Sequence, residues 1–197
     1  MFNRKAHALS ATFPSRGAVA GEAARATHAR AGDARSTTSW HKDHYENLYA
    51  QVRGVKVFLL LPPAEAYRLH ACRFPVHRWA PDGRGGLALQ PQVPAEAVPW
   101  SPVDPRPPAG RRAEAERSFP HYFDAGMPPP LEVRLRPGEV LYLPSLWQHH
   151  VRQEACTPGE AVIAVNAWYD MAFDCKFAYA QHIDKLAARL APCPGSV

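Results

Sequence analysis

Several signatures of common functional classes are missing from this sequence. Its 197 residues contain only four cysteines, and none of them forms a CxxC pair or a zinc-site spacing. No apolar run approaches the roughly 18 residues that a membrane helix needs. The N-terminus lacks a secretory apolar segment, and we find no internal repeats. We therefore expect no membrane association, and reduced or incidental thiols of an intracellular protein at Cys72, Cys156, Cys175 and Cys193.

A strong charge of either sign is also missing. The formal net charge is +5, from 23 basic and 18 acidic residues, and the arginines are scattered rather than grouped. This pattern gives no indication of a nucleic-acid partner. The length and the 46% apolar content indicate one globular domain with a real core.

Proline is plentiful, and most of the 21 prolines lie between Pro62 and Pro144. They disfavour long helices and predict short strands and loops. The β-rich segments are joined by Gly and Pro turns, which is typical of an antiparallel barrel or sandwich. In one of them, residues 140–143, four consecutive apolar side chains predict a strand covered on both faces. The predicted strands are 36–50, 55–61, 131–136, 140–143, 148–152 and 161–169.

The two ends of the chain differ from this β-rich body. Residues 1–31 are rich in Ala and Arg, contain Glu22 as their only acid, and show no sustained period. We expect a disordered or non-homologous segment there, although the composition is also that of a transit leader. Residues 171–190 predict a helix capped by Asp170. Its apolar stripe predicts packing on the body or, alternatively, a homodimer surface; the stripe is Phe173, Phe177, Ile183, Leu186 and Leu190.

The residues most suggestive of chemistry are His41 and Asp43. On one extended strand, side chains two residues apart share a face, so both can reach one metal ion. A second histidine would complete the 2-His-1-carboxylate set of non-haem iron oxygenases. An HxD pair alone often arises by chance. Lys56 follows a turn at Arg53–Gly54, and in a hairpin it would approach the metal, where a buried lysine needs an anion.

The third ligand is expected from the adjacent pair His149 and His150. On a strand these two face opposite ways, and the apolar neighbours Trp147 and Val151 favour His149 as the inward residue. Other polar positions lie on or beside predicted strands and would need hydrogen-bond partners inside a barrel: Thr38, Asn47, Tyr49 and Asn166.

Taken together, these motifs resemble the JmjC-domain, cupin-like Fe(II)/2-oxoglutarate oxygenases, in particular their small lysyl hydroxylase group. The resemblance runs from about Gly32 to Leu190, which is most of the chain. The segments that carry it are TSWHKDHYENLY (38–49), GVKVFLLLPP (54–63), VPWSPVDP (98–105), GEVLYLPSLWQHHV (138–151) and AVNAWYDM (164–171).

The resemblance implies a mainly β fold, a double-stranded β-helix with a C-terminal helix. The domain would span residues 32–170, with a Pro-rich insertion at 62–130 and the helix at 171–190. His41, Asp43 and His149 would hold Fe(II), and Lys56 would pair with the distal carboxylate of 2-oxoglutarate. Thr38, Asn47, Tyr49 and Asn166 would line the co-substrate pocket, and Trp168 would form a wall near the metal.

The implied reaction uses O2 to hydroxylate a lysine of a protein substrate, for which the family suggests a developmentally regulated GTP-binding protein. A cytoplasmic location, or a cytoplasmic and nuclear one, fits this reaction, and the leader-like composition leaves an organelle open. Family members carry opening strands before HxD that residues 1–31 do not resemble. We therefore expect a fold without its opening strands. The alternatives are a truncated non-catalytic fragment that binds metal or protein, and a metal-dependent peptidase.

Overall fold

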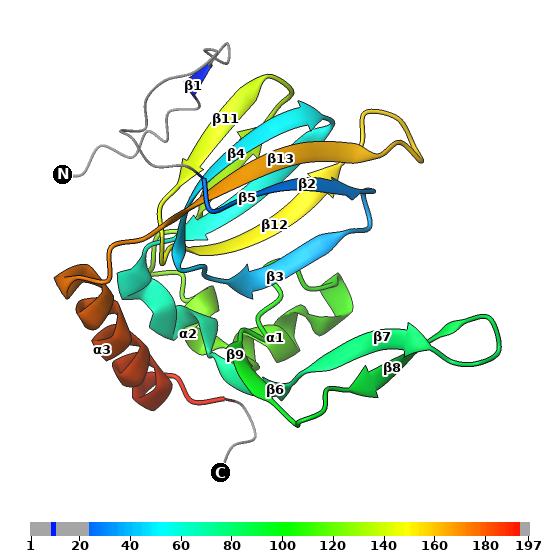
Figure 1. The fold of residues 1–197 in the computed structure, drawn as a ribbon. Helices are drawn as coiled ribbons and strands as arrows, with labels where there is room; N and C mark the ends of the chain where they lie inside the picture. The colour runs from blue at the N-terminus through cyan, green and yellow to red at the C-terminus, as the bar shows by residue number, and fades with distance from the viewer. Residues whose placement is uncertain (1–8, 11–23, 194–197) are drawn as a thin grey trace.

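The computed structural model of the chain describes residues 9–10 and 24–193. Two antiparallel sheets face each other, with a C-terminal helix beside one end (Figure 1). The five-stranded sheet has the order β1 (Leu9–Ser10), β11 (Glu139–Leu143), β4 (Tyr45–Arg53), β13 (Val162–Asp170) and β2 (Ala26–Gly32). The four-stranded sheet has the order β10 (Leu131–Leu135), β5 (Val55–Leu61), β12 (Gln148–Glu154) and β3 (Thr37–His41). The predicted mainly β fold with a final helix is confirmed.

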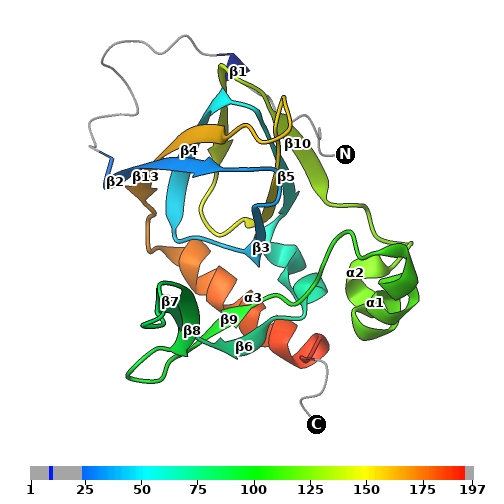
Figure 2. The same ribbon diagram turned by 90° about the vertical axis from the view of Figure 1, so that its right-hand side faces the viewer.

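Successive strands cross between the two sheets, which is what makes the arrangement a double-stranded β-helix. From β2 to β5 the chain changes sheet at each step, and it does so again from β10 to β13 (Figure 2). Apolar side chains from both sheets fill the space between them. This main core consists of Tyr49, Phe58, Leu60, Val133, Leu135, Leu141, Leu143, Val151 and Ala164.

The turn at Gly54 carries the chain from one sheet to the other, so the two strands that flank it do not form a hairpin. β4 pairs with β11 and β13, whereas β5 pairs with β10 and β12. Gly54 has φ +72°, and a Cβ there would lie 2.8 Å from the Val162 Cγ2 atom. This backbone favours glycine, and no larger side chain would fit. Lys56 of β5 therefore lies in the same sheet as β3, the strand that carries His41, and in the sheet opposite β4.

The prediction that residues 140–143 are covered on both faces is also wrong. Leu141 and Leu143 are buried, but Tyr142 is 52% exposed. Its hydroxyl donates a hydrogen bond to Glu46 Oε2 over 2.6 Å. The outer face of this sheet is open to solvent, so the strand alternates in burial despite its apolar sequence.

The N-terminal boundary expected at residue 31 needs correction. β2 pairs with β13 from Ala26 to Gly32, so the last residues of the supposed disordered segment form an edge strand of the domain. The edge that we expected to lack an opening strand is thus occupied. The sequence ATHARAG hides this strand, because small residues and one exposed face leave no apolar period. Residues 1–8 and 11–23 of the segment lie outside the described residues.

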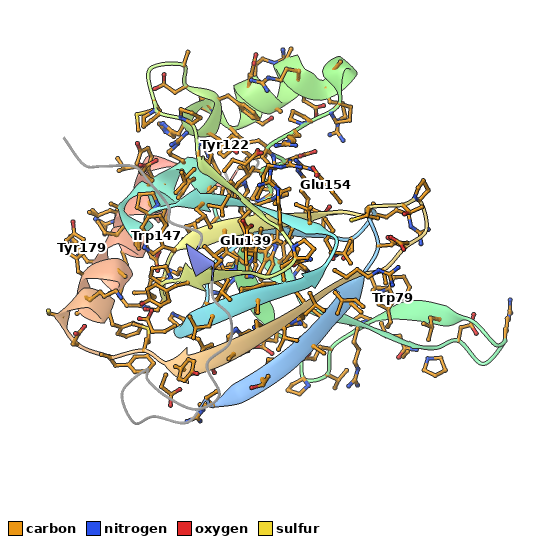
Figure 3. The ribbon with its side chains drawn as sticks, turned by 90° about the horizontal axis from the view of Figure 1, so that it is seen from above. Trp79, Tyr122, Glu139, Trp147, Glu154 and Tyr179 are labelled. Carbon is orange, nitrogen blue, oxygen red and sulfur yellow. A yellow bond between two sulfur atoms is a disulfide. The ribbon has the colours of Figure 1, made fainter. Side chains whose placement is uncertain are left out.

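The insertion between β5 and β10 forms short elements. They are η1 (Pro63–Leu69), β6 (Cys72–Pro75), β7 (His77–Pro81), β8 (Leu87–Pro91), β9 (Ala97–Trp100), η2 (Ala109–Arg111), α1 (Arg112–Ser118) and α2 (Pro120–Phe123). β6 pairs with β9, and β7 with β8. The second hairpin extends from the body and exposes 67% of Trp79 (Figure 3).

The insertion and the four-stranded sheet share a second core. The fully buried Trp40 lies at its centre, next to Tyr122 of α2, with ring centroids 6.0 Å apart. Its other members are Leu59, Leu61, Leu69 and Val103. The insertion is therefore packed against the back of the strand that carries His41.

The C-terminal helix α3 spans Cys175–Leu190 and begins later than predicted. Asp174 caps it by accepting a hydrogen bond from the Lys176 N–H, whereas Asp170 still belongs to β13. The prediction that the apolar stripe packs on the body is wrong for three of its residues, because Phe173, Leu186 and Leu190 are 67%, 38% and 64% exposed. The alternative dimer surface stays a prediction. Within the described ranges, no helix is long and apolar enough to cross a membrane.

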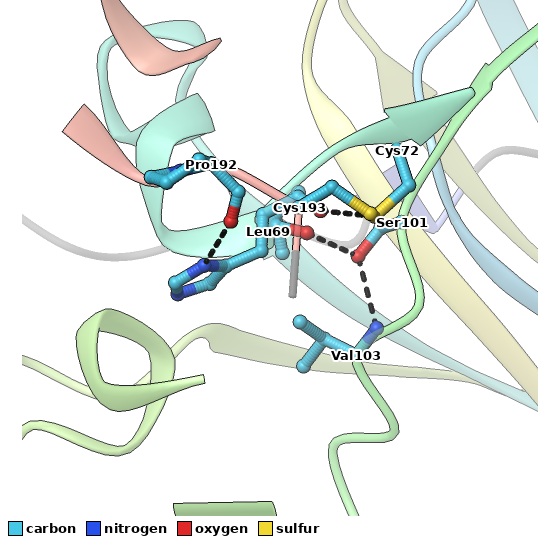
Figure 4. Close-up of a disulfide and its surroundings, with 7 residues drawn as sticks. Leu69, Cys72, Ser101, Val103, Pro192 and Cys193 are labelled. Carbon is cyan, nitrogen blue, oxygen red and sulfur yellow. Dashed lines mark hydrogen bonds between the residues drawn. A yellow bond between two sulfur atoms is a disulfide. The ribbon is translucent and has the colours of Figure 1, made fainter. Parts of the chain in front are cut away.

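Cys72 and Cys193 form a disulfide, so the prediction of reduced thiols is wrong for this pair. The bond joins β6 to the segment that follows α3 (Figure 4). The two cysteines are 121 residues apart, and a separation of that size gives no sequence signal of spatial proximity. Cys156 and Cys175 are exposed free thiols.

Candidate metal centre

A cavity of about 450 Å³ lies between the two sheets. The nine residues predicted for the site, although spread over more than a hundred positions of the chain, all line this one cavity. They are Thr38, His41, Asp43, Asn47, Tyr49, Lys56, His149, Asn166 and Trp168. The structure thus brings the whole predicted set together, while the role of each residue stays a prediction.

Three side chains at one end of the cavity form a group able to hold a metal ion. The ligand atoms of His41, Asp43 and His149 all lie within 4.8 Å of one another. His41 ends β3 and pairs in register with His149 of β12. The prediction of one strand for both His41 and Asp43 is wrong, because Asp43 lies in the loop after β3. Its carboxylate nevertheless approaches His149, with Oδ2 3.7 Å from Nε2.

Backbone carbonyls orient both imidazoles in the same way. His41 Nδ1 lies 2.8 Å from the Ser39 carbonyl oxygen, and His149 Nδ1 lies 3.0 Å from that of Trp147. A carbonyl oxygen only accepts, so each Nδ1–H donates and each Nε2 keeps its lone pair. Burial also lowers the pKa of His149 to about 4, which keeps it neutral. Two neutral imidazoles and one carboxylate fit a divalent transition metal such as Fe(II).

His150 faces the other way, as its place beside His149 predicted. It packs near the buried Trp40, with ring centroids 5.8 Å apart, outside the main cavity. Burial lowers its pKa to about 4 as well, and its Nδ1 has no hydrogen-bond partner. The choice between the two adjacent histidines therefore follows the alternation of the strand.

Helix α3 supports the loop that carries Asp43. Lys42 forms an ion pair with Asp184 of the helix, and the His44 ring lies edge-on to Phe177 at 5.8 Å. The Asp43 carbonyl also accepts a hydrogen bond of 2.9 Å from the Leu146 N–H. The loop is thus held from two sides, which fixes the direction of the Asp43 carboxylate.

Lys56 lies deep in the cavity and is only 6% exposed. Burial, together with the nearby positive charge of Arg30, lowers its pKa from 10.5 to about 8. Its ammonium group is 5.4 Å from the centre of the Tyr49 ring. Burial raises the pKa of Tyr49 to about 12, so its hydroxyl stays protonated and able to donate. A buried cation beside a donor hydroxyl forms a site for an anion.

Amide and aromatic groups form the remaining wall. The Asn166 Nδ2 donates to Asn47 Oδ1 over 3.5 Å, which satisfies a polar residue in an apolar strand. Trp168 stacks on Tyr45 with ring centroids 4.8 Å apart and planes 3° from parallel. The stacking orients the Trp168 ring, which lines the cavity, and its role as a wall near the metal stays a prediction.

Sequence reasoning missed three polar residues of the cavity and one neighbour of His41. Arg30, Ser36 and Gln153 line the cavity, and Arg30 belongs to the segment that had been set aside as disordered. Trp100 of the insertion stacks on His41, with centroids 5.1 Å apart, and donates to the Ser39 hydroxyl. The motif VPWSPVDP contains Trp100, so a signal existed for this residue. The mostly small residues of β2 gave none for Arg30.

Comparison with protein families gives a match to the family described as the cupin-like domain, over residues 3–175. Among curated proteins, the Arabidopsis thaliana protein named lysine-specific demethylase JMJ32 is 47% identical over 154 residues, covering 77% of this chain and 43% of that protein. The Homo sapiens protein named bifunctional peptidase and (3S)-lysyl hydroxylase JMJD7 is 39% identical over 79% of this chain and 45% of that protein.

A third relative, JmjC domain-containing protein E of Dictyostelium discoideum, is 35% identical over 80% of this chain and 46% of its own length. The chain thus spans less than half the length of each of these relatives. The matched part includes both segments that carry the metal-binding group in the structure.

Proposed function

The chain belongs to the cupin-like domain family, among its JmjC-type members, and on that premise we propose that it is an Fe(II)- and 2-oxoglutarate-dependent oxygenase that hydroxylates a protein. One observation carries the proposal. A group of two histidines and one carboxylate shares a single cavity with a buried lysine. The first is suited to Fe(II), and the second to the carboxylate of an organic co-substrate.

The chain's own residues would divide the work of binding. His41, Asp43 and His149 would hold the metal from one side, which leaves the cavity side open for ligands. Bound Fe(II), with 2-oxoglutarate and O2, supplies the oxidising chemistry for an unactivated C–H bond. The carbonyls of Ser39 and Trp147 keep the imidazoles turned for this task.

The co-substrate would lie with its distal carboxylate at Lys56. An ammonium with a pKa of about 8 is mostly protonated at neutral pH, and a bound carboxylate would favour the charged form further. Tyr49 and Thr38 also line the cavity and can donate hydrogen bonds to the same anion. Asn47 and Asn166 offer amide groups along the way to the metal.

The substrate would be a lysine side chain of a protein. The Arabidopsis relative is named a lysine demethylase and the human relative a lysyl hydroxylase. Both names refer to a lysine side chain. An oxygenase could carry out either reaction, because hydroxylation of an N-methyl group leads to loss of that methyl as formaldehyde. A developmentally regulated GTP-binding protein remains our expectation for the target.

A peptidase is the second candidate function, because the human relative's name includes that activity. His41, Asp43 and His149 alone would then hold the metal ion, which would supply the activation of water needed to hydrolyse a peptide bond. Hydrolysis gives no role to a buried lysine. The position of Lys56 in the cavity therefore favours the oxygenase.

The test is formation of succinate from 2-oxoglutarate by the purified chain with Fe(II) under air. We expect turnover in the wild type, its loss in His41→Ala and Lys56→Ala, and its retention in His182→Ala, a change on the outside of α3. Mass spectrometry of a lysine-peptide library would then separate gain of one oxygen from loss of a methyl group. A folded chain without turnover would overturn the oxygenase, and peptide cleavage that survives Lys56→Ala would establish the peptidase.

A further inference from the structure

Arg30 places a second positive charge in the cavity. It comes from β2 in the five-stranded sheet, whereas Lys56 comes from β5 in the four-stranded sheet. The two cations thus enter the cavity from different walls. Arg30 donates to Asn166, which pairs with Tyr49 across the sheet, and the Lys56 ammonium lies 5.4 Å from the centre of the Tyr49 ring.

The contacts of Arg30 direct its guanidinium along the cavity wall. In the sheet Arg30 pairs with Ala164, but its Nε donates to Asn166 Oδ1 over 3.4 Å. Its guanidinium carbon lies 5.8 Å from the centre of the Trp168 ring. The residue is exposed overall, but its side chain lies along β13 against Asn166 and Trp168.

The charges lining the cavity do not balance. Asp43 is the only carboxylate among the described residues that line it, and Asp43 belongs to the metal-binding group. Neither Arg30 nor Lys56 has a carboxylate within salt-bridge distance in the described part of the chain, where the other ion pairs are at the surface or in the insertion and α3. Two cations in a partly enclosed space repel each other and favour a bound anion.

We propose that Arg30 is a second anchor for the distal carboxylate of a dicarboxylate co-substrate, which would be held between its guanidinium and the Lys56 ammonium. This inference rests on the proposed function, and it adds a residue and a selectivity to it. A guanidinium can donate two parallel hydrogen bonds to one carboxylate, which a lysine cannot do. The cavity should therefore prefer a dicarboxylate to a monocarboxylate of the same length by more than Lys56 alone would give.

Isothermal titration calorimetry on the Mn(II)-loaded chain measures this preference without turnover. The two probes are 2-oxoglutarate and 2-oxopentanoate, which has the same carbon chain without the distal carboxylate. The variants are Arg30→Gln, Arg30→Lys and Lys56→Met. The matched control is Arg35→Gln, which removes the same charge nearby, at an exposed pair with Asp33.

For Arg30→Gln we expect 2-oxoglutarate affinity to fall about ten- to hundredfold, as for loss of a hydrogen bond between charged groups. Affinity for 2-oxopentanoate should change less than threefold, Arg30→Lys should recover part of the loss, and Arg35→Gln should match the wild type. A purely structural role for Arg30 would weaken both probes equally, and the unfolding midpoint of the ligand-free variants shows whether the fold is intact.

Two results would overturn the inference, and they differ in what they mean for the proposed function. If Lys56→Met abolishes 2-oxoglutarate binding while Arg30→Gln binds like the wild type, Arg30 is not an anchor and the proposed function stands. If the Mn(II)-loaded wild type fails to bind 2-oxoglutarate at all, the proposed function fails, and this inference fails with it.

Discussion

Lys56→Met gives the sharpest test of how the cavity is built, because the change should stabilise the empty protein and remove its response to co-substrate. The ammonium is buried without an anion, and its pKa is lowered from 10.5 to about 8. At 1.36 kcal/mol per pKa unit, the charged form costs the folded state about 3 kcal/mol. Methionine has a similar length, is apolar and can keep the contact with the Tyr49 ring.

The expected gain is therefore up to about 3 kcal/mol in the free energy of unfolding of Lys56→Met at pH 7, measured by urea denaturation without ligand. The matched control is Lys185→Met on the exposed side of α3, which should change stability by less than about 0.5 kcal/mol. A Lys56→Met variant only as stable as the wild type would refute the idea that the buried Lys56 charge destabilises the ligand-free protein.

The same variant should change the pH dependence. The folded pKa of Lys56 lies below its unfolded value, so between about pH 8 and 10.5 the unfolded chain binds more protons than the folded one. Wild-type stability should therefore rise relative to Lys56→Met across this range, and the difference should be largest below it. A fall in wild-type stability relative to Lys56→Met over this pH range would contradict the lowered pKa of Lys56.

Co-substrate should remove most of this difference in stability. At a concentration 100 times its Kd, 2-oxoglutarate should stabilise the Mn(II)-loaded wild type by about 2.7 kcal/mol. Lys56→Met should gain almost nothing under the same conditions. An equal gain in both proteins would show that the carboxylate lies elsewhere in the cavity.

Three further predictions concern the support of the site and the fold. Asp184→Asn should remove the ion pair that holds Lys42, and Mn(II) binding should weaken about two- to tenfold. Electron paramagnetic resonance measures this binding, and the unfolding midpoint should change by no more than a few degrees. Gly54→Ala should lower the free energy of unfolding, measured by urea denaturation, by at least about 2 kcal/mol, because Gly54 combines a positive φ with a Cβ position only 2.8 Å from Val162. Gly138→Ala is the control: Gly138 also has a positive φ, but its Cβ would meet open space, so the loss should be smaller. Cys72→Ser should lower the free energy of unfolding by about 2–4 kcal/mol, and unchanged stability after reduction would show that the disulfide has no such effect.

Much of the candidate site follows from local chemistry in the sequence. An HxD pair, a histidine with apolar neighbours and a lysine after a glycine turn are recognisable residue by residue. Strand alternation requires His149 and His150 to face opposite ways, and the apolar neighbours Trp147 and Val151 favour His149 as the inward one. The apolar and Pro-rich patterns likewise predict a β fold with short connections, and the structure has this fold.

Pairing between distant strands decided the rest. The run VKVFLLL reveals a strand, but only its neighbours β10 and β12 place Lys56 in the sheet opposite β4. In the same way, Tyr142 is exposed because the outer face of its sheet has no cover, although its sequence neighbours are apolar. Such facts depend on which strands meet, and no local pattern encodes that.

The cavity shows most clearly which features can be predicted from the sequence and which depend on the tertiary structure. The sequence by itself predicted His41, Asp43 and His149 as metal ligands and Lys56 as an anchor for an anion, because each prediction depends on a particular side chain that can be recognised in a short motif. Only the tertiary structure brought Arg30 into the same cavity, since the strand that carries it is composed largely of small residues and is recognised by its pairing with β13. The excess of positive charge in the cavity, which favours a bound anion, depends on which strands form its walls.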